Sequence, residues 1–119
     1  MSEKVEQKKA ALRDEFGFFE DPRDTFEYII AKTKDKPHLP GDLKKEEYLV
    51  KGCVSSLWLV PAYDAATGVC NFKSDADSII TRGIASLVCE LYSGLSPKEV
   101  LELDPAIFDE LKIGTQLSP

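Results

Sequence analysis

The chain has 119 residues and carries 15 Lys and Arg against 21 Asp and Glu, a formal charge of −6. This length suits a single domain with an ordinary hydrophobic core. An acidic chain lacks the positive surface that nucleic-acid binding requires, and no apolar run approaches the roughly 20 residues of a membrane span. We therefore expect one soluble domain, residues 1–119, that binds neither nucleic acid nor membranes.

The first third of the chain is predicted to form two helices and a loop. Glu3 to Phe16 is rich in Glu, Lys and Ala with a narrow apolar stripe, which is typical of a surface helix. Asp21-Pro22 places a capping side chain before a proline at the first helical position, which predicts a second helix to about Lys34. Prolines, a glycine and charges without a period predict a connecting loop from Lys36 to Glu47.

Three short strands are predicted in the middle of the chain. Their ranges are Tyr48–Val50, Leu57–Val60 and Val69–Phe72, and a turn-prone segment, Asp64–Gly68, separates the last two. Together they predict a small antiparallel three-strand sheet.

The rest of the chain is predicted to be helical. Apolar residues from Ile79 to Leu91 recur at helical spacing and predict a central core helix. Asp75 and Asp77 precede it and are interpreted as helix caps rather than metal ligands. Ser96-Pro97-Lys98-Glu99 is a capping box that opens a short helix through Leu103, and Pro105 opens a last helix to about Lys112 that Gly114 closes. This order predicts an α+β fold with helices on one sheet face.

The cysteines and the histidine exclude disulfide and zinc scaffolds. Three cysteines, Cys53, Cys70 and Cys89, cannot all pair, which favours reduced thiols in a cytoplasmic protein. Cys70 and Cys89 fall in a strand and in the core helix and are interpreted as buried, inert side chains. His38 is interpreted as a solvated loop residue, because no second ligand stands at zinc-site spacing.

Cys53 is the candidate reactive residue. It follows Gly52 in a connector between two predicted strands, where a side chain can be presented to a partner. The segment from Lys32 to Lys51 carries six lysines against four acids, and positive surroundings favour the thiolate. The alternative interpretation is a small buried hydrophobic residue that enters a strand.

Four motifs resemble those of the SufE family, the sulfur-acceptor partners of cysteine desulfurases in iron–sulfur cluster assembly. Val50-Lys51-Gly52-Cys53-Val54-Ser55-Ser56-Leu57-Trp58 resembles the family's V-x-G-C-x-S-x-V/L-W. Asp75-Ala76-Asp77-Ser78 with Arg82-Gly83 resembles D-S-D-A-x-x-x-K-G, Tyr92-Ser93-Gly94 with Ser96-Pro97 resembles Y-x-G-x-[ST]-P, and Leu117-Ser118-Pro119 resembles L-[ST]-P. Because the family usually continues beyond that last motif, we expect a single SufE-like domain that lacks the family's C-terminal helix.

The resemblance implies an SufE/IscU-like fold and a sulfur carrier and desulfurase activator rather than a stand-alone enzyme. Cys53 would bear a persulfide, and Asp77 would lie in the region that influences desulfurase contact. The residues implied to bind the partner or support the site are Lys51, Gly52, Ser55, Trp58, Asp75, Asp77 and Arg82. The implied partners are a SufS-like cysteine desulfurase, which holds the pyridoxal phosphate, and a SufBCD-like cluster scaffold. The chain itself would need no cofactor.

Three alternatives remain open from the sequence. A paralogue could feed another sulfur pathway through the same motifs. An iron–sulfur scaffold would need several thiolate or carboxylate ligands at one place, and only Cys53 has a loop position suited to that. A pure activator would stimulate the desulfurase without a covalent step.

Overall fold

The computed structural model describes residues 2–50, 56–111 and 113. Its helices and strands are, in chain order, α1 (Glu3–Phe16), α2 (Pro22–Thr33), the 3-10 turns η1 (Gly41–Leu43) and η2 (Glu46–Tyr48), β1 (Leu57–Asp64), β2 (Val69–Ala76), α3 (Ile79–Tyr92), α4 (Pro97–Glu102) and α5 (Ala106–Glu110). The predicted α+β class is confirmed.

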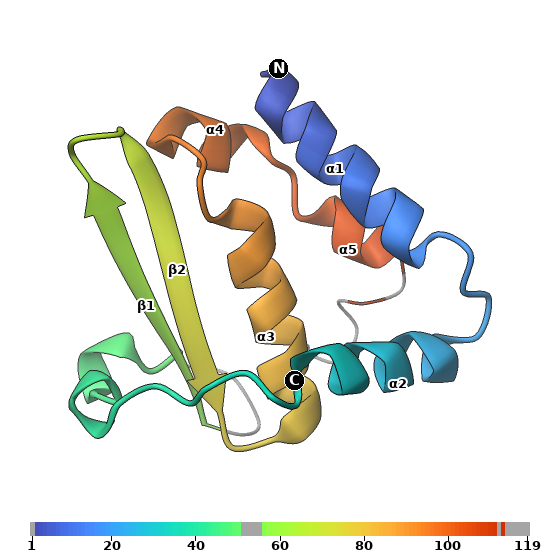
Figure 1. Ribbon diagram of the computed structural model, residues 1–119, viewed down its shortest axis with the longest axis horizontal. Helices are drawn as coiled ribbons and strands as arrows, with labels where there is room; N and C mark the ends of the chain where they lie inside the picture. The colour runs from blue at the N-terminus through green and yellow to red at the C-terminus, as the bar shows by residue number, and fades with distance from the viewer. Residues whose placement is uncertain (1, 51–55, 112, 114–119) are drawn as a thin grey trace.

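The elements form a hairpin on one side of a central helix and further helices on the other. Figure 1 shows α3 between the β1–β2 hairpin and α1, with α2 crossing near the start of α3. The apolar stripe of α3 explains this place, because Ile84, Leu87 and Leu91 are all buried. The main core also takes in residues from α1, α2, α5 and the connections around α4 and α5: Val5, Leu12, Phe16, Ile29, Leu95, Leu103, Ile107, Phe108 and Ile113. At the start of α3, Ile79 is 66% exposed, so the predicted core stripe begins at Ile80, which is half-buried and packs against the main core.

The sheet differs from the prediction. β1 and β2 pair antiparallel from Leu57 opposite Ala76 to Asp64 opposite Val69, and both strands are longer than expected. The predicted third strand at Tyr48–Val50 is reduced to a single antiparallel bridge between Leu49 and Trp58, and the sheet in the described part of the chain has two strands. The reason is local: the N–H groups of Tyr48 and Leu49 donate back to Lys45 and Glu46 in η2, so only the Val50 N–H is left to reach β1.

Polar side chains complete the ends of most helices. The predicted caps of α2 by Asp21 and of α4 by the Ser96–Glu99 capping box are confirmed. The helix α3 is capped instead by Ser78, whose hydroxyl accepts from the Thr81 N–H at 3.4 Å, so the predicted capping role of Asp75 and Asp77 is wrong. The last helix, Ala106–Glu110, is shorter than predicted, and Gly114 lies outside the described residues.

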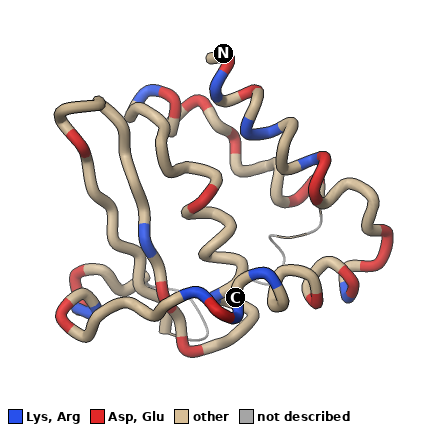
Figure 2. The backbone as a smooth tube through the Cα atoms, viewed as in Figure 1, with Lys and Arg blue, Asp and Glu red and all other residues tan. Residues whose placement is uncertain are grey.

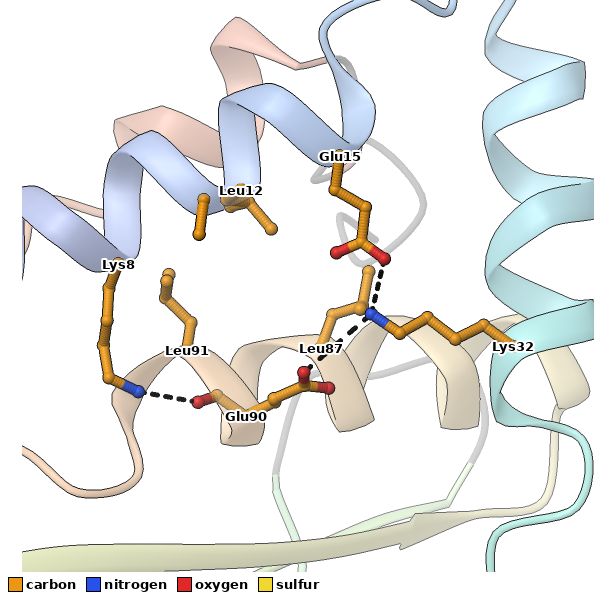
Figure 3. Close-up of a pocket in the computed structure, with 8 residues that line it drawn as sticks. Lys8, Leu12, Glu15, Lys32, Leu87, Glu90 and Leu91 are labelled. Atoms are coloured by element: carbon orange, nitrogen blue, oxygen red, sulfur yellow. Dashed lines mark hydrogen bonds and ion pairs between the residues drawn. The ribbon is translucent and has the colours of Figure 1, made fainter.

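Ion pairs and hydrogen bonds fasten α1 and α2 to α3 around a small cavity of about 160 Å³. Figure 3 shows Lys8, Glu15, Lys32 and Glu90 around apolar side chains of α1 and α3. The Lys8 ammonium donates to the carbonyl oxygens of Glu90 and Ser93 at 3.0 and 2.7 Å, where the last carbonyls of a helix lack intrahelical partners. Lys32 Nζ lies 2.6 Å from Glu15 and 3.8 Å from Glu90. This junction supports the fold.

We expect Gly83→Ala to destabilise the crossing of α2 and α3. A Cβ at Gly83 would stand 2.9 Å from Ile29 Cγ2 and 2.9 Å from Thr33 Oγ1, closer than real Cβ contacts. Overpacking a tight core position costs about 1–3 kcal/mol. The control is Gly41→Ala, since a Cβ there meets no atom within 4 Å. Urea denaturation measures both, and equal midpoints for the two variants would contradict the expected clash.

Candidate functional site

The segment that contains Cys53 lies between two fixed ends. Lys51, Gly52, Cys53 and Ser55 lie outside the described residues, so the roles assigned to them stay predictions. On the near side, the Val50 N–H donates to the Leu57 carbonyl oxygen at 2.8 Å. On the far side, the Ser56 carbonyl oxygen accepts from the Asp77 N–H at 3.0 Å. Both ends therefore meet where β1 begins and β2 ends.

A small apolar cluster supports this meeting point. Leu57, Ala76 and Ala85 are buried together, one from each of β1, β2 and α3, and Val50 packs against them. The chain before residues 51–55 thus rests on the same core as the chain after them.

Asp75 is the centre of a polar cluster at this end of the hairpin. It is the last-but-one residue of β2, and its carboxylate is fully buried. The His38 Nδ1, Lys44 Nζ and Arg82 Nε atoms lie 3.0, 3.2 and 3.1 Å from its oxygens. Its oxygens also accept from the backbone N–H groups of Leu39 at 3.0 Å and Ala76 at 2.9 Å. We call His38, Lys44, Asp75 and Arg82 the Asp75 cluster.

These contacts keep the buried carboxylate ionised. Burial by itself raises the pKa of Asp75, because a charged group loses its hydration. The hydrogen bonds from His38, from the two backbone N–H groups and from Lys44 outweigh burial and bring that pKa down to about 2. At neutral pH the cluster therefore holds one ionised carboxylate beside the basic side chains of Lys44 and Arg82.

The Asp75 cluster joins segments that are far apart in the sequence. Arg82, near the start of α3, also donates to the carbonyl oxygens of Thr33, the last residue of α2, at 3.4 Å, and of Lys36, which follows that helix. His38 and Lys44 come from the connection that leads toward Cys53. Figure 2 shows acidic and basic stretches of several segments around this end of the hairpin.

The structure brings Trp58 into the same neighbourhood. Trp58 pairs with Asp75 across the hairpin and is half-buried rather than part of the core. The Lys44 ammonium lies 5.2 Å from the centre of its ring, a cation–π contact. Asp75, Arg82 and Trp58 are thus brought together, whereas the Asp77 residue is exposed and joins the site through its backbone N–H.

Two members of the cluster were not found from the sequence. The sequence predicts His38 to be a solvated loop residue; its side chain is 66% exposed, yet Nδ1 contacts the Asp75 carboxylate. In the sequence, Lys44 stands out only as one of six lysines from Lys32 to Lys51. The excess of lysines before Cys53 indicates a positively charged segment, but it does not identify Asp75 as the carboxylate that Lys44 contacts.

The other two cysteines differ in their accessibility. Cys89 is 6% exposed, and burial raises the pKa of its thiol, while a hydrogen bond with Ser74 acts in the opposite direction. Less thiolate means less nucleophile, so the inert interpretation of Cys89 agrees with its surroundings. Cys70 is only half-buried, so its predicted burial is only partly correct.

The described residues show neither a metal-binding group nor a membrane-spanning helix. Within residues 2–50, 56–111 and 113, no group of three or more His, Cys, Asp and Glu side chains is arranged to hold a metal ion. Among the helices of the same residues, none is long and apolar enough to cross a bilayer.

A family model and individual relatives point to the same family. The family model SufE, described as an Fe-S metabolism associated domain, matches residues 10–119. An uncharacterized SufE-like protein of Rhizobium etli is 33% identical over 108 residues, which cover 88% of this chain and 73% of that protein. A second one, from Rhizobium meliloti, is 31% identical over 108 residues, covering 88% of this chain and 77% of that protein.

Plant proteins contain a similar region within longer chains. SufE-like protein 1 of Arabidopsis thaliana, named chloroplastic/mitochondrial, is 30% identical over 104 residues, or 87% of this chain and 28% of that protein. A chloroplastic quinolinate synthase of Nicotiana tabacum is 30% identical over 102 residues, or 86% of this chain and 14% of that protein. With a family model that matches residues 10–119, the chain belongs to the SufE family.

Proposed function

We propose that this protein accepts sulfur from a cysteine desulfurase on Cys53 and passes it to iron–sulfur cluster assembly. Membership of a family described by Fe-S metabolism supports a role in sulfur transfer for that metabolism. The observation that carries the assignment to Cys53 is its motif, Val50 to Trp58, whose two ends are fixed beside the Asp75 cluster.

The transfer is a thiol–disulfide exchange. The Cys53 thiolate attacks the terminal sulfur of a persulfide on the desulfurase, a new S–S bond forms, and the old S–S bond breaks. The desulfurase cysteine leaves as a thiolate, so no outside oxidant or reductant is needed. The rate of such an exchange depends on the thiolate fraction, on its nucleophilicity and on the pKa of the leaving thiol.

The cationic members of the Asp75 cluster favour this chemistry. Lys44 and Arg82 place two basic side chains beside the single carboxylate of Asp75. They lie at the end of the hairpin where Val50 and Ser56 are fixed, and Asp77 adds an exposed carboxylate at the same end. Cationic side chains near a thiol stabilise the thiolate and attract an anionic persulfide.

The remaining parts of the proposal concern partners and place. The donor is a SufS-like desulfurase that supplies the pyridoxal phosphate chemistry, and this chain adds no cofactor. The acceptor is a SufBCD-like scaffold, and the reducing cytoplasm suits a reactive thiol. Asp77 and Lys51 belong to the surface that we assign to the desulfurase.

Intact-mass analysis tests the function. The protein is mixed with a cysteine desulfurase and cysteine, and the modified residue is located by peptide mapping. We expect a gain of one sulfur atom on Cys53. An unmodified Cys53 beside a modified Cys89 or Cys70 would contradict the assignment.

One spectroscopic measurement separates the carrier from the scaffold alternative. After anaerobic addition of iron and sulfide, we expect no stable cluster chromophore that depends on Cys53. A chromophore that is present in the wild-type protein and lost in Cys53→Ser would favour a scaffold instead.

A further inference from the structure

Lys44 contacts the chain on the far side of residues 51–55. It lies between η1 and η2, before Cys53 in the sequence. Its ammonium group is 3.2 Å from Asp75 Oδ2 and 5.2 Å from the centre of the Trp58 ring. Trp58 and Asp75 are register partners at the start of β1 and the end of β2. One side chain thus binds the preceding segment to both strands that follow.

This contact adds to the backbone contacts that fix the same place. The bond from Val50 to Leu57 already joins the two sides of residues 51–55 through the backbone, and the bond from Asp77 to Ser56 fastens the far side to the end of β2. Lys44 adds a side-chain contact between the same two sides, at Trp58, which follows Leu57, and at Asp75, two residues before Asp77. Its loss should therefore allow the two sides to separate more often.

Lys44 can be removed without leaving the Asp75 carboxylate unpaired. Arg82, His38 and the N–H groups of Leu39 and Ala76 still contact that carboxylate. The Lys44 side chain is 33% exposed, so its replacement opens little core. A change in function can then be separated from a change in folding.

We propose that Lys44 is a positioning residue for sulfur transfer, which fastens the chain before Cys53 to Trp58 and Asp75 after it. The inference rests on the proposed function of Cys53. Holding a reacting group in place reduces the entropy lost when the partner approaches. The expected signature is a higher KM for this protein in the desulfurase reaction with little change in kcat.

The first test compares Lys44→Gln with Lys45→Gln. Lys45 is the neighbouring lysine, and its ammonium lies 3.9 Å from Glu47 in an exposed pair, which makes it a matched control. In Lys44→Gln, we expect the rate of amide hydrogen exchange at Val50 and Asp77 to rise roughly fivefold. This factor corresponds to the free energy that a cation–π contact or a partly exposed ion pair contributes. The emission of the single tryptophan, Trp58, should shift as well. Exchange rates and emission equal to those of Lys45→Gln would overturn the inference.

The second test measures sulfur transfer to Cys53. We expect KM for the carrier to rise roughly fivefold in Lys44→Gln. Lys44→Arg keeps the charge and stacks on aromatic rings, so it should restore most of the loss. A lower kcat at unchanged KM, or no rescue by Arg, would overturn the inference. If wild-type Cys53 takes no sulfur, the proposed function fails instead, and the exchange and fluorescence measurements still decide the role of Lys44 in the structure.

Discussion

Asp75→Asn is expected to lower the free energy of unfolding by about 3 kcal/mol, because it removes the negative charge from a buried ion cluster. Arg82 accounts for most of this loss, because its charged side chain is only 13% exposed and would be left without its carboxylate partner. Lys44 and His38 can turn partly toward water, which limits the cost. Urea denaturation at pH 7 measures the difference.

The control for this variant is Asp77→Asn. It makes the same chemical change two residues away, at an exposed position outside the cluster. Surface substitutions of this kind usually change stability by no more than about 0.5 kcal/mol. If Asp75→Asn and Asp77→Asn unfold at the same urea concentration, the Asp75 cluster contributes nothing net to the fold.

The same carboxylate predicts how stability changes in acid. The pKa of Asp75 is about 2 in the folded protein, against 3.8 for an ordinary aspartate. A lowered pKa means that the stabilisation is fully present above the unfolded value and is lost as the pH falls through the folded one. Stability should therefore fall between roughly pH 4 and pH 2 in the wild-type protein, and this part of the fall should be missing in Asp75→Asn. Identical acid profiles for the two proteins would contradict the assignment.

The helices could be predicted from the sequence because their signals are local. The capping box at Ser96, the Asp21-Pro22 start and the apolar spacing of the central helix each lie within a few residues. The third strand failed for an equally local reason, since η2 uses the N–H groups of Tyr48 and Leu49. A short apolar run does not reveal a competing turn.

The polar cluster could be predicted only in part because its contacts are long-range. Asp75 and Arg82 were identified through a family motif, and their mutual contact spans seven positions. His38 stands 37 positions before Asp75, and no spacing rule connects a loop histidine with the end of a distant strand. An aspartate before a helix also has a common local use as a cap, which Ser78 performs here.

Cys53→Ser is expected to abolish sulfur acquisition and the associated stimulation of desulfurase turnover. A serine hydroxyl has nearly the same size but ionises far less readily than a thiol, and it is a poor nucleophile toward sulfur. Turnover is measured as alanine formation with an added reductant. The reductant removes sulfur from the desulfurase persulfide, so the desulfurase can also turn over without passing sulfur to Cys53. The matched control is Cys70→Ser, which removes a half-buried thiol from β2 and should retain full stimulation.

The outcomes of this comparison separate the remaining hypotheses. Full stimulation by Cys53→Ser in the presence of reductant would mean that the protein activates its partner without a covalent step. Stimulation lost in Cys70→Ser as well would point to a folding defect rather than to thiol chemistry. Cys89 is not expected to substitute for Cys53, because its thiol is buried beside Ser74 with a raised pKa and has little thiolate to offer. Sulfur acquired only on Cys53, together with stimulation lost only in Cys53→Ser, is therefore the result that the carrier mechanism requires.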